Sequence, residues 1–192
     1  MSYLADDSER VGADPGRAVQ TSVDPRETTR YRHGVSDWVT TVSPAIRRAE
    51  PGDLDVVVEL HRQFCAADDH PFSPERARAA VPPLLDDDRC GVVWLAVDPD
   101  GRPLGYAAVT WGWSIESGGP EAVLDEIYAV EQGRGIGSTL LTHLIGDARR
   151  RGLARIFLET ERGNSRGREL YARHGFVADD SIWMSLDFVD LS

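Results

Sequence analysis

Apolar residues recur along the chain with two different periods, and these periods predict strands alternating with helices from about residue 45 onward. A short first strand is expected over 45–49. Asp53 is placed to cap the helix that follows. That helix repeats apolar residues at helical spacing: Leu54, Val57, Leu60 and Phe64. A second helix is expected to begin at Ser73, and Pro82-Pro83 must break it or end it early.

The middle of the chain has the pattern of an antiparallel meander. Residues 90–97 are apolar on both faces, which is typical of a buried strand, and the segment from Asp98 to Gly101 is a strong turn signal. Further strands are expected over 105–115 and 123–130. An amphipathic helix is then predicted over 135–151, a short strand over 156–158 and a helix over 165–174.

A last strand is predicted over 181–189, where apolar residues alternate with polar ones. The apolar positions are Ile182, Met184, Leu186 and Phe188. The order of strands and helices indicates a mixed α/β (α+β) fold, because consecutive strands form a meander before the helices and strands begin to alternate.

The first 43 residues differ from the rest, because they are polar, mixed in charge and aperiodic. Too little apolar surface is present there to offset the entropy of ordering, so we expect a flexible N-terminal arm over 1–43 and one folded domain over 44–192. A partner-binding tail is an alternative interpretation of the arm.

Charge and composition narrow the function. The chain of 192 residues has 21 basic and 32 acidic side chains and a formal net charge of −11, which argues against nucleic acid or an anionic membrane as a partner. Every basic residue is Arg, so a P-loop lysine and Schiff-base chemistry are excluded. Cys65 and Cys90 lack metal-ligand spacing, and we expect no metal. The N-terminus lacks the pattern of a signal peptide, which predicts a cytoplasmic protein.

A glycine-rich turn after the third meander strand carries the chemistry. Gly133, Gly135 and Gly137 lie where that strand gives way to the helix over 135–151. A helix N-terminus has unpaired backbone N–H groups and partial positive charge, so this turn is suited to a phosphate or diphosphate. A dinucleotide fingerprint fits less well because its third glycine is displaced here. A turn without any ligand is the remaining alternative.

Gln132-x-x-Gly135-x-Gly137 resembles the acyl-CoA diphosphate signature of the GNAT superfamily of N-acetyltransferases. Residues downstream stand at the spacing of that family's second signature: Asn164, Leu170, Tyr171, Gly175 and Phe176. The resemblance implies a mainly antiparallel central sheet with two splayed central strands and helices on both faces. The loop before Gln132 is shorter than usual for the family, and Gly167 stands where a helix former is common, at a cost of about 1 kcal/mol.

The resemblance also implies acetyl-CoA as cosubstrate and a set of residues that bind it. Backbone N–H groups near the end of the strand would bind the pantetheine arm, the turn would hold the diphosphate, and Asn164 would hydrogen-bond the pantetheine. The residues expected to bind acetyl-CoA are Ala129, Val130, Gln132, Gly133, Arg134, Gly135, Ile136, Gly137, Ser138, Asn164 and Tyr171.

Two catalytic roles follow. Tyr171 matches the family tyrosine that protonates the departing sulfur, although packing against the core is the alternative. Glu126 is our first choice of base, with Asp125 second and no base at all as the third option. Because adjacent strand residues face opposite ways, we expect at most one of these carboxylates to point into the cleft.

The acceptor pocket is predicted by fold analogy. Carboxylates beside indole rings would favour a cationic amine. The residues expected to contribute are Asp69, Trp111, Trp113, Glu116, Asp125 and Glu159, with Asp68 and His70 beside Asp69. His61, His143 and His174 lack a partner pattern, which favours packing or surface roles.

Two hypotheses of function remain. The first is an N-acetyltransferase that moves an acetyl group to a primary amine of a cationic small molecule, peptide or lysine by direct attack, without metal. The second is an acyl-CoA-binding sensor without catalysis. An enzyme that the arm targets to proteins differs from the first only in its acceptor. Family analogy adds a homodimer.

Overall fold

The computed structural model describes residues 43–186 and residue 188. The arm predicted over 1–43 therefore lies outside the described residues except for its last position. The following paragraphs concern the described part alone.

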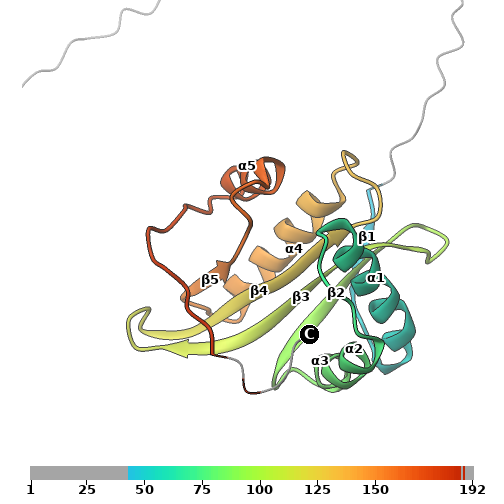
Figure 1. The fold of residues 1–192 in the computed structure, drawn as a ribbon, viewed down its shortest axis with the longest axis horizontal. Coiled ribbons are helices and arrows are strands. Elements are labelled where there is room, and N and C mark those ends of the chain that lie inside the picture. The colour runs from blue at the N-terminus through green and yellow to red at the C-terminus, as the bar shows by residue number, and fades with distance from the viewer. Residues whose placement is uncertain (1–42, 187, 189–192) are drawn as a thin grey trace, which may run out of the picture. The chain divides into compact units, whose positions relative to one another are not determined.

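A five-stranded sheet forms the centre of the domain (Figure 1), with the strands in the order of the sequence. The strands are β1 (Ala45–Arg48), β2 (Gly91–Val97), β3 (Pro103–Ser114), β4 (Gly119–Ala129) and β5 (Arg155–Leu158). Neighbours pair antiparallel from β1 to β4, whereas β4 and β5 are parallel. This arrangement confirms the predicted mixed, mainly antiparallel sheet.

Helices cover both faces of the sheet. On one face lie α1 (Leu54–Ala67), α2 (Pro74–Ala80) and α3 (Pro82–Asp86), and a short 3-10 turn, η1 (Pro51–Asp53), precedes them. On the other face lie α4 (Ile136–Arg150) and α5 (Ser165–Arg173). Two apolar cores result, because each face of a sheet must be covered separately.

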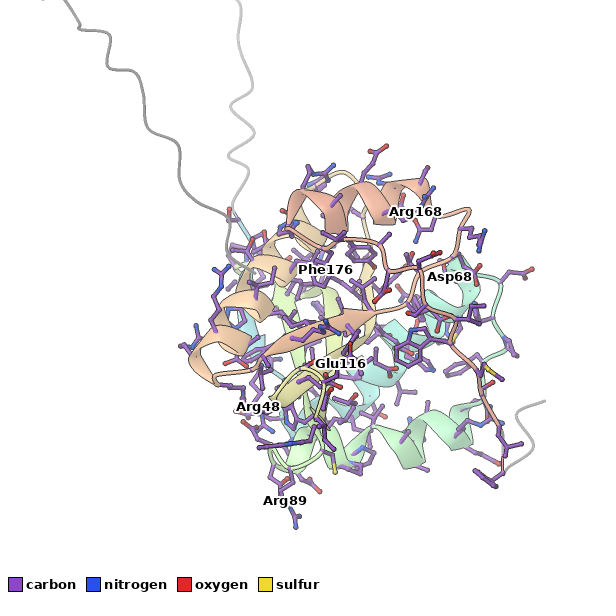
Figure 2. The ribbon with its side chains drawn as sticks, turned by 90° about the vertical axis from the view of Figure 1, so that its left-hand side faces the viewer. Arg48, Asp68, Arg89, Glu116, Arg168 and Phe176 are labelled. Carbon is purple, nitrogen blue, oxygen red and sulfur yellow. The ribbon has the colours of Figure 1, made fainter. Side chains whose placement is uncertain are left out.

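The two cores differ in composition. Val57, Leu60, Leu85, Leu95 and Tyr106 form much of the core under α1 and α3. The core under α4 contains Val92, Val109, Ile136, Leu140 and Leu141. Leu170 and Tyr171 of α5 pack against the second core, and so does Phe176 (Figure 2). The helical spacing read from the sequence therefore identifies the buried faces of α1 and α4.

The helix boundaries follow from local chemistry. The Ser73 hydroxyl accepts a hydrogen bond from the backbone N–H of Arg76 at 3.3 Å, which caps α2 as predicted. Pro82 begins α3, so the predicted break falls at Val81. Asp53 does not cap α1 through its side chain. Its carboxylate instead accepts hydrogen bonds from the Glu50 N–H at 2.8 Å and from Arg47 at 2.7 Å.

The parallel pair β4–β5 is much shorter than β4 itself. Its register runs from Glu121 opposite Arg155 to Leu124 opposite Leu158, whereas β4 continues to Ala129. Beyond Leu124 the β5 side of β4 has no strand partner among the described residues. The two strands therefore part at their carboxyl ends, which is the splay that the family resemblance implied.

The predicted C-terminal strand is wrong for the residues that the structure describes. Residues 181–186 and 188 are not in a strand, and positions 187 and 189 lie outside the described residues. The apolar side chains are solvent-exposed, for example Met184 at 90%. Alternation indicates which face of a strand is apolar, but a strand also needs a neighbour to satisfy its backbone hydrogen bonds. Here Trp183 reaches β5 only by a ring contact with Phe157.

Within residues 43–186 and 188, no helix has both the length and the apolar character needed to cross a bilayer.

Candidate active site

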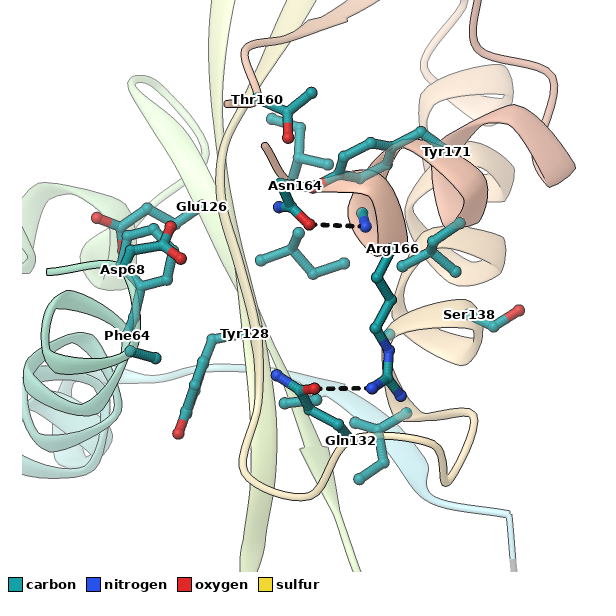
Figure 3. Close-up of a pocket in the computed structure, with 18 of the residues that line it drawn as sticks. Phe64, Asp68, Glu126, Tyr128, Gln132, Ser138, Thr160, Asn164, Arg166 and Tyr171 are labelled. Carbon is teal, nitrogen blue, oxygen red and sulfur yellow. Dashed lines mark hydrogen bonds between the residues drawn. The ribbon is translucent and has the colours of Figure 1, made fainter. Parts of the chain in front are cut away.

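A cavity of about 670 Å³ lies where β4 and β5 part. Its walls come from segments far apart in the sequence: the end of α1, the second half of β4, the turn that leads into α4, the residues after β5, and α5. Figure 3 shows that the cavity reaches both sides of β4, with Phe64, Asp68 and Glu126 on the α1 side and Asn164 and Tyr171 on the other.

The glycine-rich turn leaves backbone donors free at one end of this cavity. Gly135 has a φ of 76° and is the residue immediately before α4. The first bond within the helix runs from the Thr139 N–H to the Gly135 carbonyl at 2.9 Å. The N–H groups of residues 136–138 precede that bond, so the helix itself does not use them. Free amides and the positive end of a helix dipole are suited to binding an anion.

Other groups that line the cavity also fit acetyl-CoA. The side chains of Arg166 and Arg173 add positive charge. The hydroxyl of Thr160, between Glu159 and Glu161, is buried at the cavity, and the described residues offer it no hydrogen-bond partner. A diphosphate and the amides of a pantetheine arm would satisfy both features.

Nearly all residues predicted to bind acetyl-CoA line the cavity. The residues that do so are Ala129, Gln132, Gly133, Gly135, Ile136, Gly137, Ser138, Asn164 and Tyr171. Two others do not line it. Val130 donates its N–H to the Leu104 carbonyl at 2.9 Å, so this amide is already used in the sheet. Arg134 forms an exposed ion pair with Glu131 at 2.7 Å.

The pairing of Val130 also determines which backbone N–H at the end of β4 faces the space where β4 and β5 part. Hydrogen-bonded and non-hydrogen-bonded pairs alternate along an antiparallel ladder. Val130 opposite Leu104 is a hydrogen-bonded pair, so Ala129 opposite Gly105 is not. The N–H of Ala129 therefore points toward the β5 side, where the strands part.

Asn164 has a structural function as well as a place in the cavity. Its Oδ1 accepts the N–H of Gly167 at 2.8 Å and thereby caps α5. A Cβ at position 167 would lie 2.6 Å from the Asn164 side chain, so the close approach requires glycine there. This contact explains the helix-weakening residue noted in the sequence. Nearby, Arg166 donates to the Gln132 side chain at 2.8 Å, which ties α5 to the turn.

Tyr171 lines the cavity from α5, and its ring packs edge-on against Phe176 with centroids 6.0 Å apart. Burial raises the pKa of the Tyr171 phenol, and the charge of Asp68 adds to this effect. The phenol is therefore protonated at neutral pH and can act as a proton donor.

Glu126 also lines the cavity, and two side chains hold its carboxylate. Nδ1 of His61 lies 2.9 Å from Oε1 and 3.0 Å from Oε2. The hydroxyl of Tyr106 donates to Oε2. Burial and the Glu126 charge raise the pKa of Tyr106. The hydrogen bond to Glu126 raises the pKa of His61, although burial opposes it. The absence of a partner pattern for His61 in the sequence was thus misleading.

Asp125 lies in the same cavity as Glu126, which corrects the expectation that only one of them would. The register of β3 with β4 shifts here: Ala108 faces Glu126, and Val109 faces Leu124. Asp125 is the extra residue of a β-bulge, and a bulge breaks the alternation of side chains. Desolvation by surrounding protein and the Glu126 charge raise the pKa of Asp125, although its side chain is open to the cavity.

Several carboxylates line the cavity. Figure 3 shows Asp68, which follows α1, and Glu126 on the α1 side of β4, across that strand from Arg166. Asp125 on β4 and Glu159 and Glu161 after β5 add further negative charge to the lining. Aromatic rings lie beside them, because Phe64 and Tyr128 line the cavity with ring centroids 6.5 Å apart.

The structure places four predicted acceptor residues outside this cavity: Asp69, Trp111, Trp113 and Glu116. The last three lie toward the β3–β4 turn, where Trp111 pairs with Ala122, whereas the cavity borders the other end of β4 (Figure 2 labels Glu116 and Asp68). Trp111 donates its indole N–H to the Asp88 carbonyl at 2.8 Å, and Arg151 covers its ring. The β3–β4 hairpin carries these three residues toward its turn, away from the cavity. Asp125, Glu159, Asp68 and His70 do line the cavity.

Sequence reasoning missed several residues that the structure brings to the site. His61 is one helical turn from Val57 and from Cys65, which are both buried. This spacing could have predicted that His61 lies on the inward face of its helix. Arg166 stands two residues after Asn164, in the first turn of α5. The contact of Tyr106 with Glu126 could not be predicted from the sequence, because a tyrosine in a buried strand is usually explained by packing alone.

The comparisons with known proteins agree with this geometry. A family model described as the Acetyltransferase (GNAT) family matches residues 55–176, which is more than half of the chain. The chain belongs to the GNAT acetyltransferase family. Acetyl transfer is therefore its general activity, and the matched region contains all the lining residues of the cavity. No curated protein sequence matches the chain significantly.

Solved structures show the same fold. A ribosomal-protein-alanine N-acetyltransferase from Brucella melitensis biovar Abortus 2308 is 23% identical, with a TM-score of 0.59, over 74% of this chain and 99% of that one. A predicted acetyltransferase from Clostridium acetobutylicum, solved with acetyl-CoA, is 19% identical, with a TM-score of 0.63, over 74% and 95%. An aminoglycoside acetyltransferase from an uncultured soil metagenomic sample, in complex with sisomicin, is 17% identical, with a TM-score of 0.60, over 76% and 96%.

Proposed function

We propose that this GNAT protein is an N-acetyltransferase that moves an acetyl group from acetyl-CoA to a primary amine by direct attack. One observation carries the proposal: a single cavity is lined by the free amides at the start of α4 with Arg166 and Arg173, and by Asp68 and Glu126 on the α1 side of β4. The structure of the Clostridium neighbour with acetyl-CoA supports the cosubstrate. We place the protein in the cytoplasm on the sequence pattern alone.

Different residues of the chain have different roles in the proposed reaction. Bound acetyl-CoA supplies the acetyl group and a thiolate leaving group. The Ala129 N–H donates to the carbonyl oxygen, where negative charge develops, and Glu126 takes a proton from the attacking amine. The new C–N bond forms as the C–S bond breaks, and Tyr171 protonates the sulfur. The products are an N-acetyl amine and free CoA, and no metal takes part.

A cationic acceptor fits the carboxylates that line the cavity. Asp68, Glu159 and Glu161 would pair with ammonium groups beyond the reacting amine, and the Phe64 and Tyr128 rings add cation–π attraction. The acceptor class is therefore a small polyamine or aminoglycoside-like amine, or a basic peptide. Among the neighbours of similar fold, one is named for a ribosomal-protein alanine and one was solved with the aminoglycoside sisomicin, which is compatible with either a protein or a small-molecule acceptor.

The test is release of free thiol from acetyl-CoA in the presence of a panel of amines that differ in charge. We expect turnover to rise with the number of positive charges on the amine. In Glu126→Gln and Tyr171→Phe we expect kcat to fall by about 10²- to 10⁴-fold with little change in CoA affinity, because each variant removes one proton transfer.

Glu131→Gln is the matched control for Glu126→Gln, since it also removes one carboxylate beside the cavity but sits on the turn. Tight CoA binding without turnover of any amine would favour the sensor hypothesis instead. Equal turnover in wild type and in both catalytic variants would remove the assigned roles.

A further inference from the structure

His61 stands behind the proposed base rather than in the cavity. It lies on α1, and it is not among the residues that line the cavity, whereas Glu126 is. Its ring contacts those of Phe72, with centroids 5.6 Å apart, and Phe64, with centroids 6.3 Å apart. These contacts restrict the rotation of the imidazole, whose Nδ1 lies 2.9 Å from the Glu126 carboxylate.

The carboxylate of Glu126 is consequently held from two elements. His61 reaches it from α1, and Tyr106 reaches it from β3. Tyr106 is almost fully buried, at 1% exposure, and cannot move with the ligand. A carboxylate fixed in this way keeps its remaining lone pairs turned to the cavity, which is the orientation that a base requires.

We propose that His61 is a positioning residue for the reaction: through Nδ1 it holds the Glu126 carboxylate toward the cavity, and its protonation switches that base off. This inference rests on the proposed function, in which Glu126 accepts a proton from the attacking amine. When the imidazole is neutral, Nδ1–H orients the carboxylate and Glu126 keeps its full negative charge. When the imidazole is protonated, it forms an ion pair with the carboxylate, and the two groups together carry no net charge to attract the proton of the amine.

The groups that face His61 are consistent with this switch. Glu126 and Asp125 on β4 both favour its protonated form. Tyr106 on β3 is neutral, since its pKa lies above the ordinary value. On α1 itself, the Sγ of Cys65 lies 3.6 Å from Nε2, and burial raises the pKa of this thiol, so it contributes no charge. The carboxylates on β4 therefore dominate the titration of His61.

The test compares His61→Phe with His61→Asn. Asparagine can place an amide N–H near the position of Nδ1–H but cannot be protonated, whereas phenylalanine keeps the ring packing and loses the hydrogen bond. We expect kcat to fall by about 10- to 100-fold in His61→Phe, with the KM for acetyl-CoA changed less than about twofold. In His61→Asn we expect kcat well above that of His61→Phe.

The pH profile separates positioning from a purely structural role. In wild type the acid limb of kcat should have its midpoint at the pKa of His61 measured by NMR. In His61→Asn the limb should move to lower pH by at least about one unit, because the switching charge is gone. His143→Asn is the control, since His143 on α4 packs edge-on against Trp94 and does not line the cavity; it should leave the profile unchanged. An acid limb that is the same in wild type and His61→Asn would overturn the proposal.

A second measurement does not depend on turnover. The NMR titration of His61 should show its pKa falling in Glu126→Gln, because the hydrogen bond to the carboxylate is lost. An unchanged titration would overturn the coupling. If wild type acetylated no amine while the titration shifted as expected, the proposed function would fail and the coupled pair would stand.

Discussion

Gly135→Ala tests the anion site at the start of α4 through the backbone alone. The φ of Gly135 is 76°, and an alanine in this region costs about 1–2 kcal/mol. No atom lies within 4 Å of the Cβ that the substitution adds, so steric overlap contributes nothing. The chain can relieve the strain only by rotating the residue, and that rotation turns the N–H groups of residues 136–138 away from the cavity.

The expected loss of affinity follows from the bonds that these amides would make. A hydrogen bond to a charged group contributes about 1.5–3 kcal/mol, so losing one weakens CoA binding by about 10- to 150-fold. Titration calorimetry with CoA measures this directly. The strain should also lower the melting temperature, by about 2–4 °C for each kcal/mol in a domain of this size.

Gly118→Ala is the matched control. Gly118 has a φ of 78°, also has open space around its Cβ position, and lies in the β3–β4 turn away from the cavity. We expect the same thermal destabilisation as in Gly135→Ala with wild-type CoA affinity. If Gly135→Ala binds CoA as tightly as wild type, or if Gly118→Ala loses as much affinity, the amides at the start of α4 are not the diphosphate site.

Three further predictions concern stability. Leu85→Ala should cost about 2–5 kcal/mol in chemical denaturation, because Leu85 is 1% exposed in the core under α3; a loss below 1 kcal/mol would mean that the site collapses without a cavity. Asn164→Ala should cost about 1 kcal/mol by removing the cap of α5, measured by thermal melting, and an unchanged melt would contradict the cap. The Arg47 hydrogen bond lowers the pKa of Asp53, so its contribution is present above the unfolded pKa and is lost as the pH falls through the folded pKa. Asp53→Asn should therefore flatten the stability curve between about pH 5 and pH 3, and an identical curve would refute the pair.

The strands and helices of the described domain could largely be predicted from the sequence. Burying one face of a helix or a strand makes its apolar residues recur at a spacing that is characteristic of that element. The helix over 135–151 became α4 with a difference of one residue at each end. The segment over 181–189 shows the limit of this reasoning. Its alternation is as regular as that of a strand, yet no edge of the sheet pairs with residues 181–186, and pairing is a tertiary property that periodicity does not carry.

The site was harder to predict than the fold, and the reasons are specific. The glycine motif predicted where α4 begins beside the cavity, since a helix N-terminus is a local feature, and its role as an anion site stays a prediction. The position of Asp125 depends on a bulge, and a bulge arises from the register of β3 against β4. The contact of His61 with Glu126 spans 65 residues, so no spacing rule could reveal it.

The place of the cavity follows from the parallel pairing of β4 with β5. In a parallel pair both carboxyl ends lie at the same edge, and the connecting helix must begin there to return to the start of the next strand. The start of α4, the second half of β4 and the residues after β5 therefore all border the same cavity. Because β4 and β5 stop pairing after Leu124, the cavity can reach both faces of the sheet between these two strands. Under the proposed function, the positive groups and the carboxylates that line this one cavity would favour an anionic cosubstrate beside a cationic acceptor, so that the thioester and the amine would meet there.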